Sequence, residues 1–338
     1  MVYGAIDLHL RYSQIRILDE AGMVVCDRRV LTSRARLTQA FADQGPMRIL
    51  LETGTESEWV AQALELAGHE VIVADPNYAP MYGERTRRIK TDRRDVAALA
   101  EANRRGWYRA THRVSAAQRE TRQILRSRRL LVQQRAGLIS LVRALLKQSG
   151  YRLPSGSCDT IPSRVARLAL PPTLADTLAP LARQAATLTT EIRAIEARMR
   201  MRVAADPIVA RLQTIPGVGA IVATSVRALL DTVDRFRHAG QVSATIGLVP
   251  REHSSAERQH RGHITKAGSR ELRALCIQAA WACWRSPGGA PLRPWVDRLA
   301  TRRGRRIAVV ALARRLSRIM YAVWRDGVAF DGTRFATA

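Results

Sequence analysis

Cysteine and long apolar stretches are scarce in this chain of 338 residues. Its four cysteines form no C-x-x-C pair, which argues against a zinc site of the usual spacing. Cys276 and Cys283 lie in an apolar helical stretch, where we expect reduced and buried thiols. No run of about 18 apolar residues occurs, so the sequence predicts no membrane span. Charged residues interrupt the start of the chain, which argues against a signal peptide and predicts a cytoplasmic protein.

Acidic residues and lysines are also few. The chain has 29 Asp+Glu against 55 Lys+Arg, a formal net charge of +26, and only three of the basic residues are lysines. A GC-rich genome favours arginine codons, and phosphate binding favours arginine too, because its guanidinium binds oxygens in a bidentate way. The excess of positive charge is therefore more informative than the choice of arginine. It predicts a polyanionic partner, DNA or RNA.

Hydrophobic residues make up 46% of the chain, which is enough for a buried core. Alternating and continuous apolar runs, separated by turn signals, predict the first part of the fold. We expect strands at 2–8, 12–18, 23–30, 47–52 and 70–75, and helices at 34–43, 56–67 and 92–104. Three strands followed by alternating helices and strands give a mixed sheet with helices on its faces. This order is that of the ribonuclease-H-like fold, which includes the RuvC-type resolvases.

The rest of the chain reads as mainly helical. Apolar pairs recur every seven residues over 114–149, which favours a coiled coil or helical hairpin, and a second helical stretch ends near Met201. This part is either a plain helical core or a connector that dimerises or grips RNA. Residues 214–219 either resemble the turn of a helix-hairpin-helix or form an ordinary turn between helices. Further helices are expected at 269–285 and 305–325. We therefore predict an α/β plus all-α chain with domains at 1–110, 111–205 and 206–338.

Four carboxylates stand out in a chain this basic, because carboxylates repel phosphate unless a divalent metal bridges the two. Asp7 and Glu52 end strands that are neighbours in the expected fold, and Asp92 and Asp95 share one face of a helix. Taken singly, Asp92 reads as a helix cap and Glu52 as a turn residue. Together they predict a site for two divalent ions, Mg²⁺ or Mn²⁺. We expect the nearby His9 to be a buried, hydrogen-bonded histidine, with contact to the metal site as the alternative.

Several short motifs resemble those of one family. Residues 5–9 (AIDLH), 51–54 (LETG) and 89–95 (IKTDRRD) are similar to the DEDD motifs of the one-ten insertion-sequence (IS) transposases. These are relatives of the Piv invertases and are described as bridge-RNA-guided recombinases. Residues 247–255 (GLVPREHSS) and 262–268 (GHITKAG) resemble the C-terminal transposase domain of the same family. The resemblance spans nearly the whole chain.

This resemblance implies a chemistry and a set of partners. The acidic quartet would bind metal, and a serine of the C-terminal domain would attack a DNA phosphate and become covalently linked to the strand. The family pattern places a small residue, usually Gly, after the nucleophile. Ser255 is followed by Ala256, which is small but departs from Gly, so we predict Ser255 as the nucleophile and keep Ser254 as the alternative. The family also implies donor and target DNA, a structured guide RNA, and dimers that pair into a tetramer. In that assembly the serine of one subunit serves the metal site of another.

Basic residues around these motifs are candidate phosphate contacts. They are Arg85, Arg87, Arg88, Arg93 and Arg94 beside the acidic site, and Arg251, Arg258, Arg261 and Lys266 beside the serines.

Two other functions remain open from the residues alone. A metal-dependent nuclease, or Holliday-junction resolvase, would use the acidic quartet with water and would not need Ser255. A non-catalytic nucleic-acid-binding protein would need neither.

Overall fold

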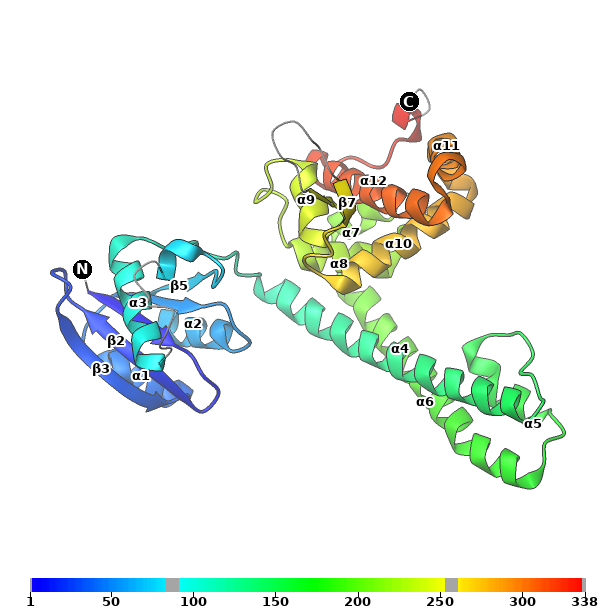
Figure 1. Ribbon diagram of the computed structural model, residues 1–338, viewed down its shortest axis with the longest axis horizontal. Helices are drawn as coiled ribbons and strands as arrows, with labels where there is room; N and C mark the ends of the chain where they lie inside the picture. The colour runs from blue at the N-terminus through cyan, green and yellow to red at the C-terminus, as the bar shows by residue number, and fades with distance from the viewer. Residues whose placement is uncertain (1, 83–90, 253–260, 336–338) are drawn as a thin grey trace. The chain divides into compact units, whose positions relative to one another are not determined.

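The computed structural model describes residues 2–82, 91–252 and 261–335. The chain forms two compact units, Met1–Arg113 and Val114–Ala338 (Figure 1). The first is a mixed α/β unit and the second is mainly helical, which confirms the coarse fold prediction. The three-domain division remains a prediction.

A five-stranded sheet in the order β3-β2-β1-β4-β5 forms the centre of the first unit. Its strands are β1 (Tyr3–Asp7), β2 (Tyr12–Leu18), β3 (Val24–Leu31), β4 (Arg48–Glu52) and β5 (Glu70–Ala74). The first three strands pair antiparallel, whereas β1, β4 and β5 run parallel. The predicted strands and the neighbouring positions of β1 and β4 are therefore confirmed.

Helices cover both faces of this sheet. They are α1 (Arg34–Ala42), α2 (Ser57–Leu66) and α3 (Asp92–Arg105), with a short 3-10 helix at Ala79–Tyr82. Ile6 and Leu51 pack against α1 and α2, whereas the preceding residues Ala5 and Leu50 pack against α3. This alternation follows from the two-residue period of a strand. The helices and the sheet therefore form three layers, and the ends of the strands remain available for functional residues.

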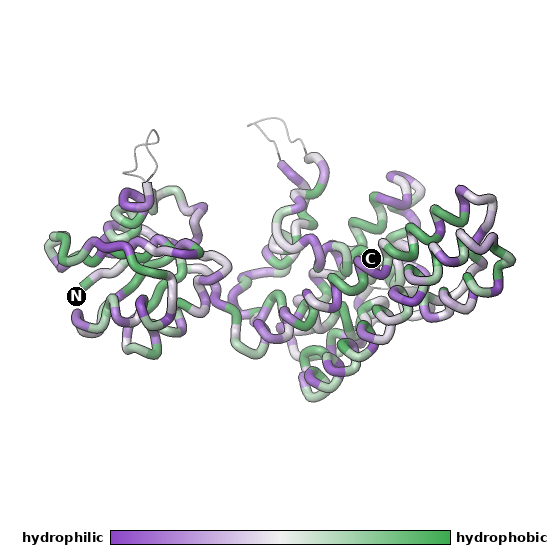
Figure 2. The backbone as a smooth tube through the Cα atoms, turned by 90° about the horizontal axis from the view of Figure 1, so that it is seen from below, coloured by the Kyte–Doolittle hydropathy of each residue, from purple (hydrophilic) through white to green (hydrophobic). Residues whose placement is uncertain are grey.

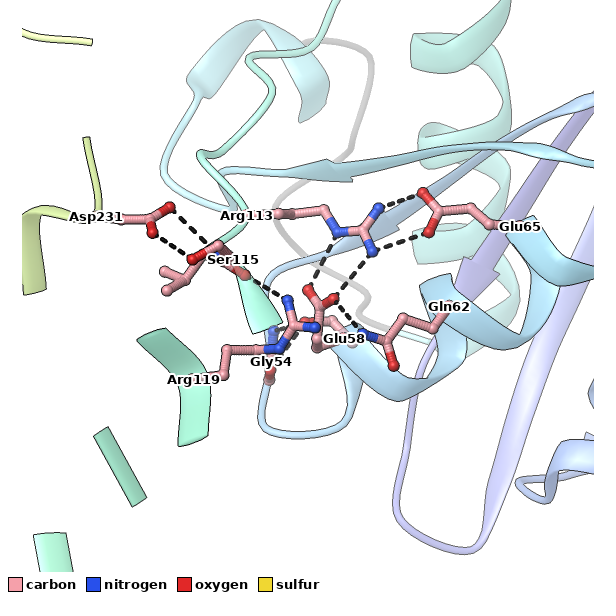
Figure 3. A network of polar contacts seen from close by, with 10 residues as sticks. Gly54, Glu58, Gln62, Glu65, Arg113, Ser115, Arg119 and Asp231 are labelled. Carbon is pink, nitrogen blue, oxygen red and sulfur yellow. Dashed lines mark hydrogen bonds and ion pairs between the residues drawn. The ribbon is translucent and has the colours of Figure 1, made fainter. Parts of the chain in front are cut away.

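Arg113 closes the first unit with a network of ion pairs (Figure 3). Its guanidinium binds Glu58 on α2 at 3.0 and 3.1 Å and also binds Glu65 near the end of the same helix. Figure 3 shows the guanidinium between the two carboxylates. The hydrogen bonds that Arg113 donates to Glu58 and Glu65 raise its pKa, so it stays charged. The network fixes the end of this unit to α2.

Two long helices begin the second unit. They are α4 (Ala116–Gln148) and α6 (Pro172–Val203), with a 3-10 helix at Cys158–Thr160 and α5 (Ile161–Ala166) in their connection. Val142 and Leu146 pack against Leu178 and Ala182, so the two form an antiparallel hairpin. Figure 2 shows hydrophobic and hydrophilic positions alternating along the helices. The predicted long helices are confirmed.

The remaining helices enclose the largest core. They are α7 (Pro207–Leu212), α8 (Ala220–Leu230), α9 (Ala239–Ile246), α10 (Arg270–Arg285), α11 (Arg293–Arg303) and α12 (Arg305–Asp326), with 3-10 helices at Pro287–Leu292 and Gly332–Phe335. Strands β6 (Pro250–Glu252) and β7 (Arg261–Ile264) pair as a small antiparallel sheet. The helices predicted at 269–285 and 305–325 are confirmed.

The turn expected to resemble a helix-hairpin-helix joins α7 to α8. Gly217 has a φ of +81°, and a Cβ built there would lie 2.2 Å from the carbonyl oxygen of Ala279 on α10. Only glycine fits this close approach. Binding of phosphate by this turn remains a prediction.

Both cysteines of α10 are buried, as predicted. Cys276 and Cys283 are free thiols with no exposed surface. Burial raises the pKa of Cys276 to about 12 and that of Cys283 to about 11, so neither ionises near neutral pH.

Candidate active site

Asp7 and Glu52 lie at the same edge of the first unit's sheet. Each is the last residue of its strand, and β1 and β4 pair in parallel with Ile6 opposite Leu51. The carboxyl ends of adjacent parallel strands meet at one edge, where α/β sheets commonly bind ligands. Both carboxylates line one pocket of about 280 Å³. The sequence prediction that these two residues approach each other agrees with this geometry.

Asp92 and Asp95 come to this edge from the first turn of α3. Thr91 caps that helix, because its hydroxyl accepts a hydrogen bond from the amide of Arg94. Asp95 is 8% exposed, whereas the Asp92 side chain is more than half exposed. Carboxylates in a first helical turn are favoured by the helix dipole. Asp92 is the first residue of α3, and the helix cap, which the sequence also allowed at Asp92, is Thr91.

Asn103 fixes α3 against the sheet at the other end of the helix. Its side chain is fully buried, and its amide nitrogen donates to the carbonyl oxygens of Gly4 and Arg48 at 2.8 and 2.9 Å. Gly4 belongs to β1 and Arg48 to β4, the strands that carry Asp7 and Glu52. One side chain thus ties together the three elements that supply the acidic quartet.

His9 is exposed and contacts two of the carboxylates, which contradicts the prediction of a buried histidine. Its Nε2 lies 3.2 Å from Oδ2 of Asp7 and 3.5 Å from Oδ1 of Asp92. The prediction was wrong because β1 ends at Asp7, so His9 leaves the sheet. One potential ligand atom from each of these three residues lies within 4.8 Å of the other two. The alternative expectation, that His9 touches the acidic site, agrees with these distances.

The electrostatics of Asp7 suit a cation. Burial raises its pKa, and the nearby charges of Asp95 and Asp92 raise it further, although His9 opposes this. Its Oδ2 is buried and forms no hydrogen bond of ordinary geometry within the described residues. Apart from the His9 nitrogen at 3.2 Å, this oxygen has no donor within the described residues, which is costly for a buried carboxylate. A divalent ion with oxygen ligands would offset that cost. These residues therefore fit a divalent metal.

The candidate phosphate contacts of the first unit are only partly described. Arg93 is exposed, and its Nε donates to Asp27 at 3.2 Å, so part of its guanidinium already has an acceptor. The backbone amide of Arg94 completes the Thr91 cap. Arg85, Arg87 and Arg88 lie outside the described residues. Phosphate binding by these arginines remains a prediction.

The serine segment falls between two described strands. Ser254, Ser255 and Arg258 lie outside the described residues, whereas β6 ends at Glu252 and β7 begins at Arg261. Arg251 in β6 is exposed, as is Lys266 beyond β7. Lys266 has a φ of +57°, a left-handed conformation that is uncommon outside glycine.

Comparison with known proteins identifies the family. A model described as "Transposase IS116/IS110/IS902 family" matches residues 209–292, and a DEDD transposase model matches residues 5–150. A probable family 20 transposase of Pseudomonas aeruginosa is 30% identical over 94% of this chain and 95% of its own length. The chain belongs to this transposase family. The match to the DEDD model also implies a divalent metal.

Two further insertion-sequence transposases are similar to this chain along most of their length. The transposase for insertion sequence element IS1111A of Coxiella burnetii is 30% identical over 94% of this chain and 88% of its own. The transposase for IS1328 of Yersinia enterocolitica is 27% identical over 96% of this chain and 97% of its own. The chain is therefore an insertion-sequence transposase, an enzyme that cleaves DNA and transfers strands. Within its described residues no helix is both long and apolar enough to cross a bilayer.

Proposed function

We propose that this transposase is a DNA recombinase that joins a metal site of Asp7, Glu52, Asp92 and Asp95 to a serine nucleophile, Ser255. The observation that carries the metal part is the meeting of β1, β4 and the first turn of α3 at one sheet edge. The strand order with β1 next to β4 supports a RuvC-like fold for the first unit. The family resemblance supports the serine.

The serine step conserves the energy of the phosphodiester bond. The Oγ of Ser255 attacks the scissile phosphorus, an Oγ–P bond forms, and the P–O bond to one DNA strand end breaks. The Ser255 proton passes to solvent or a base, and the departing oxygen takes up a proton to become a hydroxyl. A hydroxyl of another strand end then attacks the phosphoserine, which releases Ser255 and rejoins DNA without ATP.

The described residues would divide the work around that step. When bound, Mg²⁺ or Mn²⁺ would offset charge on the scissile phosphate and favour ionisation of the attacking group. Asp7, Glu52, Asp92 and Asp95 would hold the metal. Arg251 and Lys266, which are exposed on either side of the serine segment, would bind phosphate oxygens.

A guide RNA and an oligomer would complete this function. Base pairing by a structured RNA would select donor and target DNA, and the chain would bind the RNA through its phosphates, which the net charge of +26 supports. Dimers would pair into a tetramer in which the serine of one subunit serves the metal site of another. The assembly would act in the cytoplasm.

A trapping assay tests this function. The protein is incubated with Mg²⁺, the RNA flanking its element and labelled donor and target DNA, then denatured and mapped by mass spectrometry. We expect a DNA adduct on Ser255 that is lost in Ser255→Ala and in Asp7→Asn but kept in Ser254→Ala. Cut DNA without an adduct, in wild type and Ser255→Ala alike, would instead favour a hydrolytic nuclease.

A further inference from the structure

A second pocket, of about 360 Å³, lies within the second unit between α4, α8 and the start of α10. Arg122, Arg126 and Arg129 of α4 line it, and their spacing places them on one face of the helix. Arg270, the first residue of α10, adds a fourth guanidinium. The pocket walls therefore concentrate positive charge from two helices that are far apart in the sequence.

The walls of this arginine pocket are fixed by hydrogen bonds. Arg122 donates from Nε and Nη2 to the carbonyl oxygens of Ala228 and Leu229, both at 2.8 Å. At the beginning of α4, the amide and hydroxyl of Ser115 donate to Asp231, just beyond α8, at 3.1 and 2.6 Å (Figure 3). These contacts hold α4 against the end of α8, so the pocket is preorganised and does not require ordering on binding.

The arginine pocket has hydrogen-bond donors of two kinds that can bind a ligand, a buried hydroxyl and the backbone amides at a helix N-terminus. Ser225 is 6% exposed, and its Oγ is buried on the pocket wall with no hydrogen-bond partner in the described chain. At the start of α10, Ser269 caps the amide of Leu272 at 3.1 Å. The amides of Arg270 and Glu271 have no acceptor within the helix. A hydroxyl that can donate, next to a helix N-terminus, is suited to an anion.

The charges and the shape of the arginine pocket define that anion. Arg126 and Arg270 form no ion pair with any carboxylate in the described parts of the chain, and Glu271 lies 3.4 Å from Arg129. Four guanidinium groups against one carboxylate leave the pocket positive. No aromatic residue is among its described lining, so it offers no platform for stacking a base. Arginine forks and amide donors match phosphate oxygens.

We infer that the arginine pocket binds a phosphodiester group of the nucleic-acid backbone. The occupant is a phosphate of RNA or DNA, which share this chemistry. The site is built only from residues of the second unit and uses neither the carboxylate quartet nor Ser255. The inference therefore stands or falls independently of the proposed chemistry.

Binding measurements in EDTA test the arginine pocket without the metal site. The full chain is titrated into a fluorescent RNA duplex and a DNA duplex of the same sequence over a range of KCl concentrations. Arg126→Ala is expected to weaken binding about tenfold and to reduce the slope of log Kd against log salt by about one. Ser225→Ala removes a buried hydroxyl without an acceptor, so it should keep the melting temperature yet weaken binding several-fold.

Two matched variants separate a pocket from general electrostatics. Arg143→Ala removes another exposed arginine of α4 that does not line the pocket. Thr224→Val removes a buried hydroxyl that also has no partner in the described chain and lies outside the pocket lining. Selective losses in Arg126→Ala and Ser225→Ala support the inference, and the duplex affected identifies the phosphate's source. Equal losses in Arg126→Ala and Arg143→Ala, or unchanged binding in Ser225→Ala, would refute it.

Discussion

Replacing Asn103 should loosen the acidic edge from a distance. Asn103→Leu keeps a similar volume but removes both hydrogen bonds from α3 to Gly4 and Arg48. Each buried hydrogen bond contributes about 1 kcal/mol, and a carbonyl left without a donor costs more. We therefore expect the variant to lower the free energy of separating α3 from the sheet by about 2–3 kcal/mol.

Hydrogen exchange followed by mass spectrometry measures this separation in the full chain. A loss of about 2 kcal/mol corresponds to roughly 30-fold faster exchange, which should appear in peptides that contain β1, β4 and α3. Exchange in the second unit should stay unchanged, because opening is local. Local exchange is the appropriate assay, since a chain with two compact units need not unfold in one step.

Asn77→Ala provides the control for Asn103→Leu. The Asn77 side chain is exposed, and within the described residues it bonds only to the neighbouring Asp75, at 3.1 Å, so its loss should change exchange by less than about threefold. If Asn103→Leu also left exchange in β1 and β4 within threefold of wild type, the assigned role of Asn103 would be refuted.

Three further predictions concern stability. Because the pKa of Asp7 is raised, its contribution to stability is complete below its usual pKa and is lost as pH rises through the raised value. In EDTA, the melting temperature of Asp7→Asn should therefore rise relative to that of wild type between acid and neutral pH. Added Mg²⁺ should reverse that order, since saturation at 100 times Kd adds about 2.7 kcal/mol to wild type alone, and equal Mg²⁺ shifts would contradict the site. Gly217→Ala should lower the free energy of unfolding by about 3 kcal/mol or more, because of the positive φ at this position and the close approach to the Ala279 carbonyl. Gly219→Ala, with open space around it, should lower it by less than about 1 kcal/mol in the same thermal assay. Arg113→Lys should lose the paired contacts to Glu58 and destabilise the first unit by about 1 kcal/mol, which should appear as faster hydrogen exchange in α2. Unchanged exchange in α2 would mean that the network is not stabilising.

Much of the first unit's fold was predictable from local sequence. The strand from Tyr12 to Leu18 was predicted with its exact bounds, because one face is buried and the apolar positions alternate. Asp7 and Glu52 could be paired in advance, since both end apolar strands and the element order predicts which strands are neighbours. Long helices such as α4 were predictable because their apolar positions repeat over many turns.

Features that depend on distant partners were not predictable. The hydrogen bonds of Asn103 join residues 99 and 55 positions apart, and no local pattern indicates them. The short helix α9 and the β6–β7 pair were missed because each is too brief to show a period, and their formation depends on tertiary contacts. His9 was expected to be buried because it directly follows the strand predicted at 2–8, but β1 ends at Asp7 and His9 is exposed.

Because two of its four thiols are buried, the transposase has two remaining cysteines that can be labelled selectively. Cys276 and Cys283 are buried and resist ionisation, so a maleimide dye will react with them slowly. Cys26 in β3 and Cys158, in the connection of the long hairpin, are partly exposed. The native chain therefore carries one addressable thiol in each compact unit. Two dyes on the unmodified sequence would report whether the distance between the units changes when nucleic acid binds.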